Sequence, residues 1–279
     1  MTRLAVDTPA LRPDALAPSR RRRRVPRWAL GLVFPVVVGV SWEIGAISGA
    51  ISTRLIPAPS EIARTLAVLA SDGDLLGHSL TTTFRVLAGF VLGATVATVL
   101  GAATGVSERF CAVFDPTLQA LRNIPSIAWT PLFILWFGIF ETSKVLMIAL
   151  GVFFPVYLTF SGAIASVDRR LVEVGRIYGL GTTTLIRRIL LPASLPTYLI
   201  GLRNGLGLGW MFVVAAEFLG ASQGLGYLLV DGQQTGRPAV IISSIVMFAL
   251  LGRVTDRLLA WGGARFTGWE DGFTRRAVA

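Results

Sequence analysis

Long apolar runs alternate with short polar segments along this chain. A run of about 20 apolar residues has the length that a helix needs to cross the hydrocarbon core of a bilayer. We place six such spans on the sequence, at residues 28–50, 79–105, 124–140, 145–164, 194–216 and 238–262. The third is the least regular, because Pro125 and Pro131 interrupt its start. The pattern predicts an all-α, polytopic membrane protein with about six transmembrane helices in a domain at residues 28–264.

The amino-terminal 27 residues are rich in proline, alanine and arginine and contain the run Arg20–Arg24. A basic block before an apolar run is also the pattern of a secretory or twin-arginine signal. The run from Trp28 to Ala50 is, however, longer than the apolar region of about 7–15 residues in a signal peptide, and no A-x-A-like site follows it. We therefore expect residues 1–27 to be a disordered, basic cytoplasmic tail before an uncleaved first span.

The composition agrees with a membrane protein. Hydrophobic residues make up 53% of the chain and charged residues 15%, and the mean hydropathy is +0.66. A soluble domain usually carries about 25% charged residues, and a soluble protein with one very large core would not need several separate spans. The 30 glycines suit closely packed membrane helices.

The net charge of +10 raises the alternative of nucleic-acid binding. The basic residues lie mostly between the apolar runs, without the interleaved aromatic residues that bind single strands. They instead follow the rule that cytoplasmic loops are rich in arginine and lysine. With a cytoplasmic N-terminus, the outer segments hold only Arg54, Arg64, Lys144 and Arg237. We therefore expect both termini, including the tail at residues 265–279, to be cytoplasmic in a bacterial inner membrane.

The segment 51–78 is the expected site of a short amphipathic helix on the outer surface, with Ser60 as its N-cap and a turn at residues 71–74. Charged residues also occur near the outer ends of the spans. These residues are Glu43, Arg85 and Glu217. We expect either an ion pair between Glu43 and Arg85 or charged side chains that extend into the lipid headgroup region.

The cytoplasmic loop at residues 165–192 is too long for an ordinary connection. Its apolar residues recur at helical spacing on either side of the sequence GLG at 179–181. This predicts two short amphipathic helices joined by a glycine bend. Thr182 or Thr183 is the expected cap of the second helix, and Pro192 marks the return into the membrane.

The same loop resembles the EAA motif of permease subunits in bacterial ABC importers, E-A-A-x3-G-x9-I-x-L-P. Glu173, Gly179, Ile189 and Leu191-Pro192 match this spacing, whereas Val174 and Gly175 replace its two alanines. The segments LIPAPSEI (55–62), ALRNIPSIAWTPLFILWFGIFETSK (120–144) and AEFLGASQGLGYLL (216–229) are similar to the nitrate, aliphatic sulfonate and taurine branch of that family. The resemblance covers residues 28–270 approximately.

This resemblance implies a type I ABC importer permease fold and a loop that docks on an ATPase subunit. It also implies the partners: a second permease copy, two ATPases and an extracytoplasmic binding protein that delivers a small anion such as a sulfonate, taurine or nitrate. The implied ATPase-coupling residues are Glu173, Arg176, Gly179, Ile189, Leu191 and Pro192.

No residues with catalytic chemistry were identified in the sequence. It lacks a G-x-x-x-x-G-K-[ST] phosphate loop, because Lys144 follows GIFETS. One cysteine, Cys111, and one histidine, His78, exclude a disulfide and a histidine- or cysteine-rich metal site. We expect no cofactor in this chain, with ATP and Mg bound by the separate ATPase, and no enzyme activity of its own.

Arg203 lies about ten residues into the fifth span, a costly depth for a charge. It has two alternative explanations, an attraction point for an anionic substrate or an ion pair between helices. Asn204, Trp210 and Trp136 complete the expected substrate pathway, which we place along the third and fifth spans. A secondary transporter or channel is the alternative function, although the sequence shows no internal repeat.

Overall fold

The computed structural model describes residues 27–218 and 220–266, and within them every regular element is helical. The predictions for the tails at residues 1–27 and 265–279 lie almost wholly outside the described residues. The all-α architecture is confirmed for the described part of the chain.

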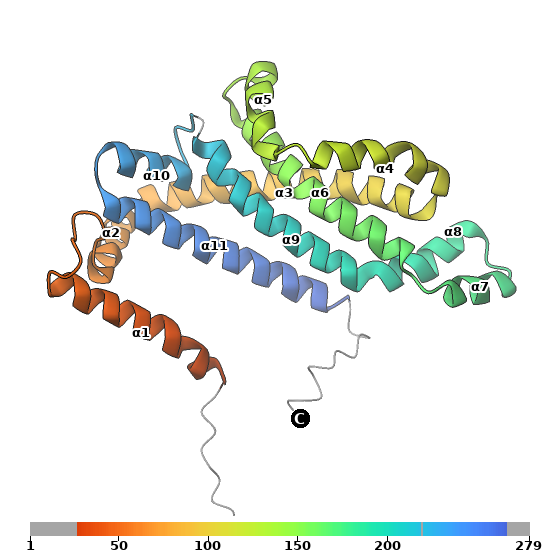
Figure 1. The fold of residues 1–279 in the computed structure, drawn as a ribbon, viewed down its shortest axis with the longest axis horizontal. Helices are drawn as coiled ribbons and strands as arrows, with labels where there is room; N and C mark the ends of the chain where they lie inside the picture. Colours follow the sequence, from red (N-terminus) through yellow and green to blue (C-terminus); the bar gives the residue numbers. More distant parts are fainter. Residues whose placement is uncertain (1–26, 219, 267–279) are drawn as a thin grey trace, which may run out of the picture.

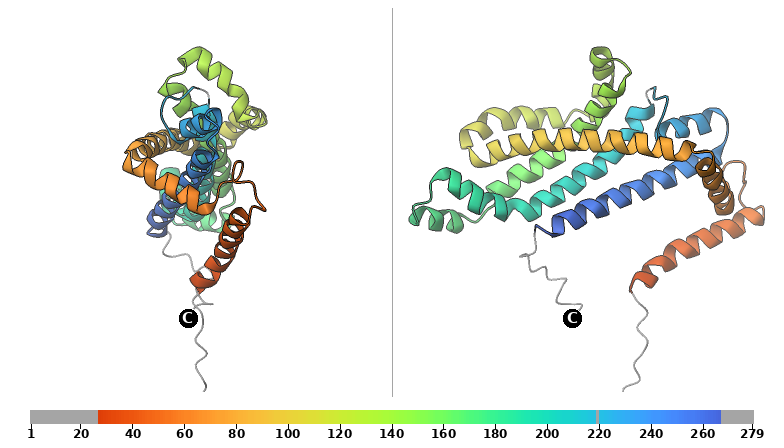
Figure 2. Two further views of the ribbon diagram at one scale, coloured as in Figure 1. Left: turned by 90° about the vertical axis from the view of Figure 1, so that its left-hand side faces the viewer. Right: turned by 180° about the vertical axis from the view of Figure 1, so that it is seen from behind.

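Four long helices lie side by side and form the body of the molecule (Figures 1 and 2). They are α3 (Asp74–Val106), α6 (Glu141–Ala165), α9 (Leu191–Phe218) and α11 (Pro238–Ala264). Each is long and apolar enough to cross a membrane, α9 together with the residues from Thr182 that lead into it. The predicted second, fourth, fifth and sixth spans are therefore confirmed, although most of the helices extend a few residues beyond the predicted ends.

The other two predicted spans are less regular. The first corresponds to α1 (Arg27–Ile47), which stands apart from the four long helices in Figures 1 and 2 and joins them through α2 (Pro59–Ser71). The third span is wrong as a single helix. It consists of a 3₁₀ turn, η1 (Ser126–Trp129), and α5 (Thr130–Phe137), because a proline interrupts the start of each piece and Gly138, at φ 73°, ends the second.

Two helices were not predicted. The first, α4 (Glu108–Arg122), is capped by the hydroxyl of Ser107, which accepts a hydrogen bond from the Phe110 N–H, and it lies beside α3 and α6. Tyr157 ties it to the core by donating to Asp115 at 3.0 Å. The second, α10 (Leu225–Gln234), packs on α11 at the opposite end of the bundle.

Two smaller predictions about helix ends are wrong. Helix α2 begins at Pro59 with Ala58 as its N-cap, and Ser60 instead donates to the Glu43 carboxylate at 2.7 Å. The second loop helix begins at Thr182 after Gly181, without a threonine cap. Pro192 does lie where the chain enters the long membrane helix: α8 (Thr182–Leu185), the π turn η2 (Ile186–Leu190) and α9 are continuous, but Figure 1 shows α8 at an angle to α9. The wider π turn accommodates the proline, which lacks a hydrogen-bond donor.

Close contact between α3 and α6 organises the core. Small residues recur every fourth position along α3, at Gly89, Gly93, Ala97, Gly101 and Gly105. A Cβ atom on Gly89 would lie 2.6 Å from Cβ of Ile148, and one on Gly93 would overlap the backbone carbonyl of Ala149. The helices therefore meet backbone to backbone, as small residues permit in membranes. Trp210, Leu206 and Val213 of α9 complete this cluster.

Substitution of Gly93 by leucine is expected to separate α3 from α6, because the obstacle is backbone and cannot move aside. Overpacking of this kind costs about 1–3 kcal/mol or more. A lower midpoint of thermal unfolding in detergent would show the effect. Gly77→Leu on the same helix is the matched control, since no atom lies within 4 Å of its Cβ position. An equal effect of both substitutions would contradict the assigned contact.

Candidate functional site

The first loop helix, α7 (Arg169–Ile177), is closed at both ends by local hydrogen bonds. At its start, the Asp168 carboxylate accepts from the Arg170 N–H at 2.9 Å. At its end, Gly179 adopts φ +71° and donates to the Arg176 carbonyl at 2.9 Å, while Leu180 N–H reaches the Gly175 carbonyl at 3.0 Å. This is the pattern of a Schellman motif, which requires a left-handed residue. The predicted glycine bend is confirmed.

Gly175 explains how α7 packs against the second loop helix. It is buried, and a Cβ atom there would lie 2.8 Å from Cδ1 of Ile189 and 3.4 Å from Cδ1 of Leu185. Ile189 of the matched motif therefore points at α7 and holds the two helices together. A glycine in place of the motif's alanine leaves room for this isoleucine.

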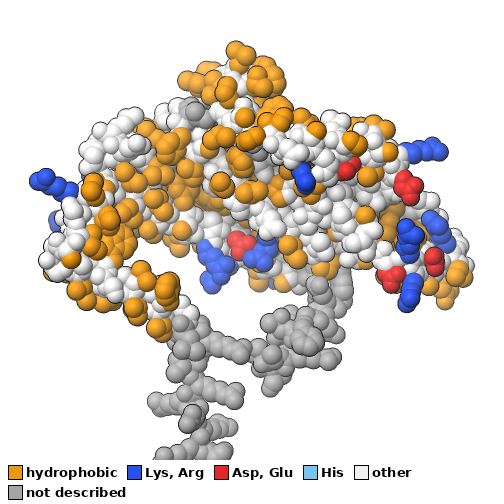
Figure 3. Space-filling model, in the orientation of Figure 1, with side chains coloured by type: hydrophobic (Ala, Val, Ile, Leu, Met, Phe, Trp, Pro, Cys, Tyr) orange, Lys and Arg blue, Asp and Glu red, His pale blue; other side chains and the backbone are white. Residues whose placement is uncertain are grey.

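Most apolar residues of α7, and Tyr178 directly after it, point outward. Exposed fractions are 49% for Leu171 and Val174, 83% for Ile177 and 81% for Tyr178. Glu173 and Arg176 are exposed beside them, and neither forms an ion pair with any described residue. Figure 3 shows charged side chains gathered at this end of the molecule. An exposed apolar group of this kind, rimmed by charges, is typical of a protein-binding surface.

The last two coupling candidates, Leu191 and Pro192, lie at the start of α9. The side chain of Leu191 is 36% exposed, and Pro192 is partly buried. Because α8, η2 and α9 are continuous, both residues lie where the loop joins the long membrane helix.

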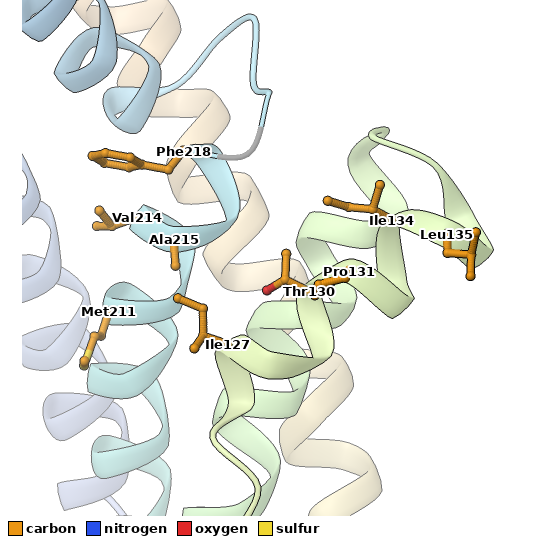
Figure 4. A pocket seen from close by; sticks show the side chains of 9 residues that line it. All are labelled: Ile127, Thr130, Pro131, Ile134, Leu135, Met211, Val214, Ala215 and Phe218. Carbon is orange, nitrogen blue, oxygen red and sulfur yellow. The ribbon is translucent and has the colours of Figure 1, made fainter.

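A large apolar groove separates α5 from α9, with a volume of about 1000 Å³ (Figure 4). Its lining comes, apart from Phe218, from the predicted third and fifth spans and contains a single hydroxyl side chain, that of Thr130. The lining residues are Ile127, Thr130, Pro131, Ile134, Leu135, Met211, Val214, Ala215 and Phe218.

None of the four predicted pathway residues lines this groove. Trp136 is 59% exposed on α5, beside Phe133. Trp210 is buried and donates from Nε1 to the Thr255 hydroxyl of α11 at 2.9 Å. Asn204 is exposed on α9, further toward the loop. Whether these residues meet substrate stays a prediction.

Arg203 forms an ion pair between helices, the second of its two predicted alternatives. Its guanidinium donates to both carboxylate oxygens of Asp256 on α11, at 2.7 and 2.9 Å. Arg253 lies 3.6 Å from the same carboxylate. The side chain of Arg203 is still 45% exposed, so the pair lies at the surface of the chain.

A polar cluster occupies the far end of the bundle from the loop, with Arg85, Lys144 and Glu217 buried and the side chain of Glu141 60% exposed. The Arg85 guanidinium contacts Glu141 of α6 through two bonds of 2.5 and 2.6 Å, and Glu217 of α9 at 2.7 Å. Lys144 adds a 3.1 Å contact to Glu141. The predicted Glu43–Arg85 pair is wrong, because Glu43 binds Ser60 instead.

Glu217 is the centre of this cluster and is completely buried. It accepts from the Thr82 hydroxyl at 2.8 Å and from the Gly226 N–H at 2.7 Å, in addition to Arg85. Gly224, at φ +125°, lies so close that a side chain there would overlap the carboxylate. The segment after α9 is therefore held against α3. The sequence signal that was missed is the pair of glycines in GLG at 224–226.

Comparison with models of protein families shows to which family the chain belongs. The model of the binding-protein-dependent transport system inner membrane component matches residues 89–267, well over half of the sequence. The chain belongs to this family. The matched part includes α7, α8, the groove and Glu217, whereas α1 and α2 precede it.

The family relatives agree with the predicted branch. The putative aliphatic sulfonates transport permease protein SsuC of Bacillus subtilis is 38% identical and aligns over 88% of this chain and 89% of its own length. The taurine transport system permease protein TauC of Escherichia coli is 28% identical over 89% and 94%, respectively. The nitrate import permease protein NrtB of Synechococcus elongatus is 32% identical over 64% and 65%. The chain is thus an ABC importer permease subunit, a multi-pass inner membrane component without enzyme activity of its own.

Proposed function

We propose that this permease forms the translocation path for a small organic anion of the sulfonate class and couples it to a separate ATPase through the surface of α7. The observation that carries the coupling role is the exposed apolar face of α7 beside Glu173, at the spacing of the EAA motif. Such a face needs a partner to cover it. The continuous helix from Thr182 to Phe218 connects that partner to the groove.

The substrate class rests on relatives and on the lining of the groove. Two of the relatives described above are named for sulfonates and taurine. An aliphatic sulfonate combines a charge with an alkyl portion, and the almost wholly apolar groove suits the alkyl portion. The open side of the groove further supports a second permease copy that closes the path between two chains, with the binding protein at the α2–α10 end.

The orientation follows from charge. The α7–α8 end carries Arg169, Arg170, Arg176, Arg187 and Arg188, and we assign it to the cytoplasm together with both termini. The cluster around Glu217 then faces outward.

Reconstitution tests this function. Vesicles that hold the chain, its ATPase and its binding protein should hydrolyse ATP faster, and accumulate substrate, when an aliphatic sulfonate is added. Omission of the ATPase should abolish uptake. Uptake driven by an ion gradient in vesicles without ATPase would instead support the secondary transporter.

A further inference from the structure

The cytoplasmic halves of α9 and α11 together carry a basic cluster that the transport path does not explain. It consists of Arg203, Arg253 and Arg257 around the single carboxylate of Asp256. Arg203 and Arg253 share that carboxylate, and Arg257 forms no ion pair with any described residue. Two positive charges are therefore uncompensated. Figure 3 shows basic side chains on both sides of an acidic one over the middle of α11.

The cluster lies on a helix face that is apolar nearer the outer end. Val246, Leu250, Arg253 and Arg257 follow helical spacing along one side of α11, and all four are exposed. The outer part of this face has the character of a lipid-facing surface. The α5–α9 groove receives no residue from α11, which separates the cluster from the proposed path.

The depth of the cluster matches the inner lipid headgroups. Arg257 lies 19 residues after Pro238, which is about 28 Å along a helix and close to the thickness of the hydrocarbon core of about 30 Å. One turn further, Trp261 is 63% exposed with the Arg265 guanidinium 4.3 Å from the centre of its ring. An exposed tryptophan beside arginine marks the membrane interface. Arg253 is deeper and can extend its side chain toward the same level.

A pocket adjoins the cluster on its cytoplasmic side. It lies between α9 and α11, has a volume of about 240 Å³, and includes Arg203 and Thr197 in its lining. Its other walls are apolar residues such as Leu199, Ile200 and Leu259. A small polar headgroup fits this space, with its phosphate at the arginines and its acyl chains along Val246 and Leu250.

We infer that this cluster is a binding site for an anionic phospholipid of the inner leaflet, held by its phosphate at Arg203, Arg253 and Arg257. Basic pockets between membrane helices on the cytoplasmic side bind such headgroups. The inference rests on the orientation proposed above and not on the substrate or the coupling role.

The test measures lipids retained by the assembled transporter, extracted in mild detergent from membranes that contain phosphatidylglycerol and phosphatidylethanolamine. Native mass spectrometry should detect bound phosphatidylglycerol. The double variant Arg253→Gln/Arg257→Gln should retain about 30-fold less, at about 1 kcal/mol for each arginine removed, and Arg257→Lys alone should retain most of it. The control Arg54→Gln/Arg237→Gln, which removes two charges at the other end, should retain as much as the unaltered protein.

Several results would overturn the site. Equal retention by the double variant and the control would do so, as would loss of phosphatidylglycerol on addition of inorganic phosphate or a free sulfonate, which would identify a soluble anion. A double variant that retains its lipid but dissociates into single permease chains would assign the cluster to a second copy. Because lipid retention is measured without nucleotide and without transport, the outcome is independent of whether the proposed transport activity is correct.

Discussion

Gly179→Pro is expected to abolish substrate-stimulated ATP hydrolysis and uptake, while the chain still inserts in the membrane. Gly179 adopts φ +71° and donates its N–H to the Arg176 carbonyl. Proline fixes φ near −65° and has no N–H, so the end of α7 cannot form. The exposed face with Ile177 and Tyr178 would then no longer have a fixed position relative to α9. Reconstituted transporter with the ATPase and binding protein provides the measurement.

Two companion variants separate loss of shape from loss of contact. Gly181→Ala is the matched control, because Gly181 has φ −64° and open space around it, and it should keep full stimulation. Glu173→Ala should lose stimulation through a different cause. The side chain is exposed, so its removal should change stability by no more than about 0.5 kcal/mol. Normal stimulation in both Gly179→Pro and Glu173→Ala, with the ATPase bound, would refute the coupling role.

The long helices could be predicted because hydrophobic length alone determines them. The apolar runs in α3, α6, α9 and α11 exceed what a bilayer requires, and no competing pattern exists at that length. The prediction of the third span as one helix was wrong for a local reason, because Pro125, Pro131 and Gly138 each break the helix. Helix α4 was missed because it is amphipathic, with none of its residues buried.

Contacts between distant residues could not be predicted. Arg85 is separated from Glu141 by 56 residues and from Glu217 by 132, and the sequence offered Glu43 as an equally charged partner. Only the packing of α3 against α6 and α9 selects the correct carboxylates. The loop was predicted more fully, because its spacing matches a known motif. The role of Gly175 nevertheless depends on its contact with Ile189, which no spacing shows.

Glu217→Ala should destabilise the outer end of the permease severely. The change leaves the buried Arg85 with Glu141 and the Gln223 carbonyl as partners, and it removes the acceptor of Thr82 and of the Gly226 N–H. Removal of one partner from a buried ion pair typically costs about 3–5 kcal/mol. The expected result is a much lower thermal unfolding midpoint in detergent, with poor recovery of the purified chain. Glu43→Ala, which loses only contacts to Ser60, should unfold close to the unaltered protein.

The double variant Arg85→Met/Glu217→Gln distinguishes an uncompensated charge from lost packing. This variant removes both charges of the buried pair, so neither is left without its partner. Apolar replacement of such a pair is often neutral for stability. The amide oxygen of the introduced glutamine can still accept from the Gly226 N–H, and Glu141 keeps Lys144 as its partner. The double variant should therefore recover most of the stability that Glu217→Ala loses. If it unfolds as early as Glu217→Ala, the cluster acts mainly through shape, and the cost assigned to the unpaired charge is wrong.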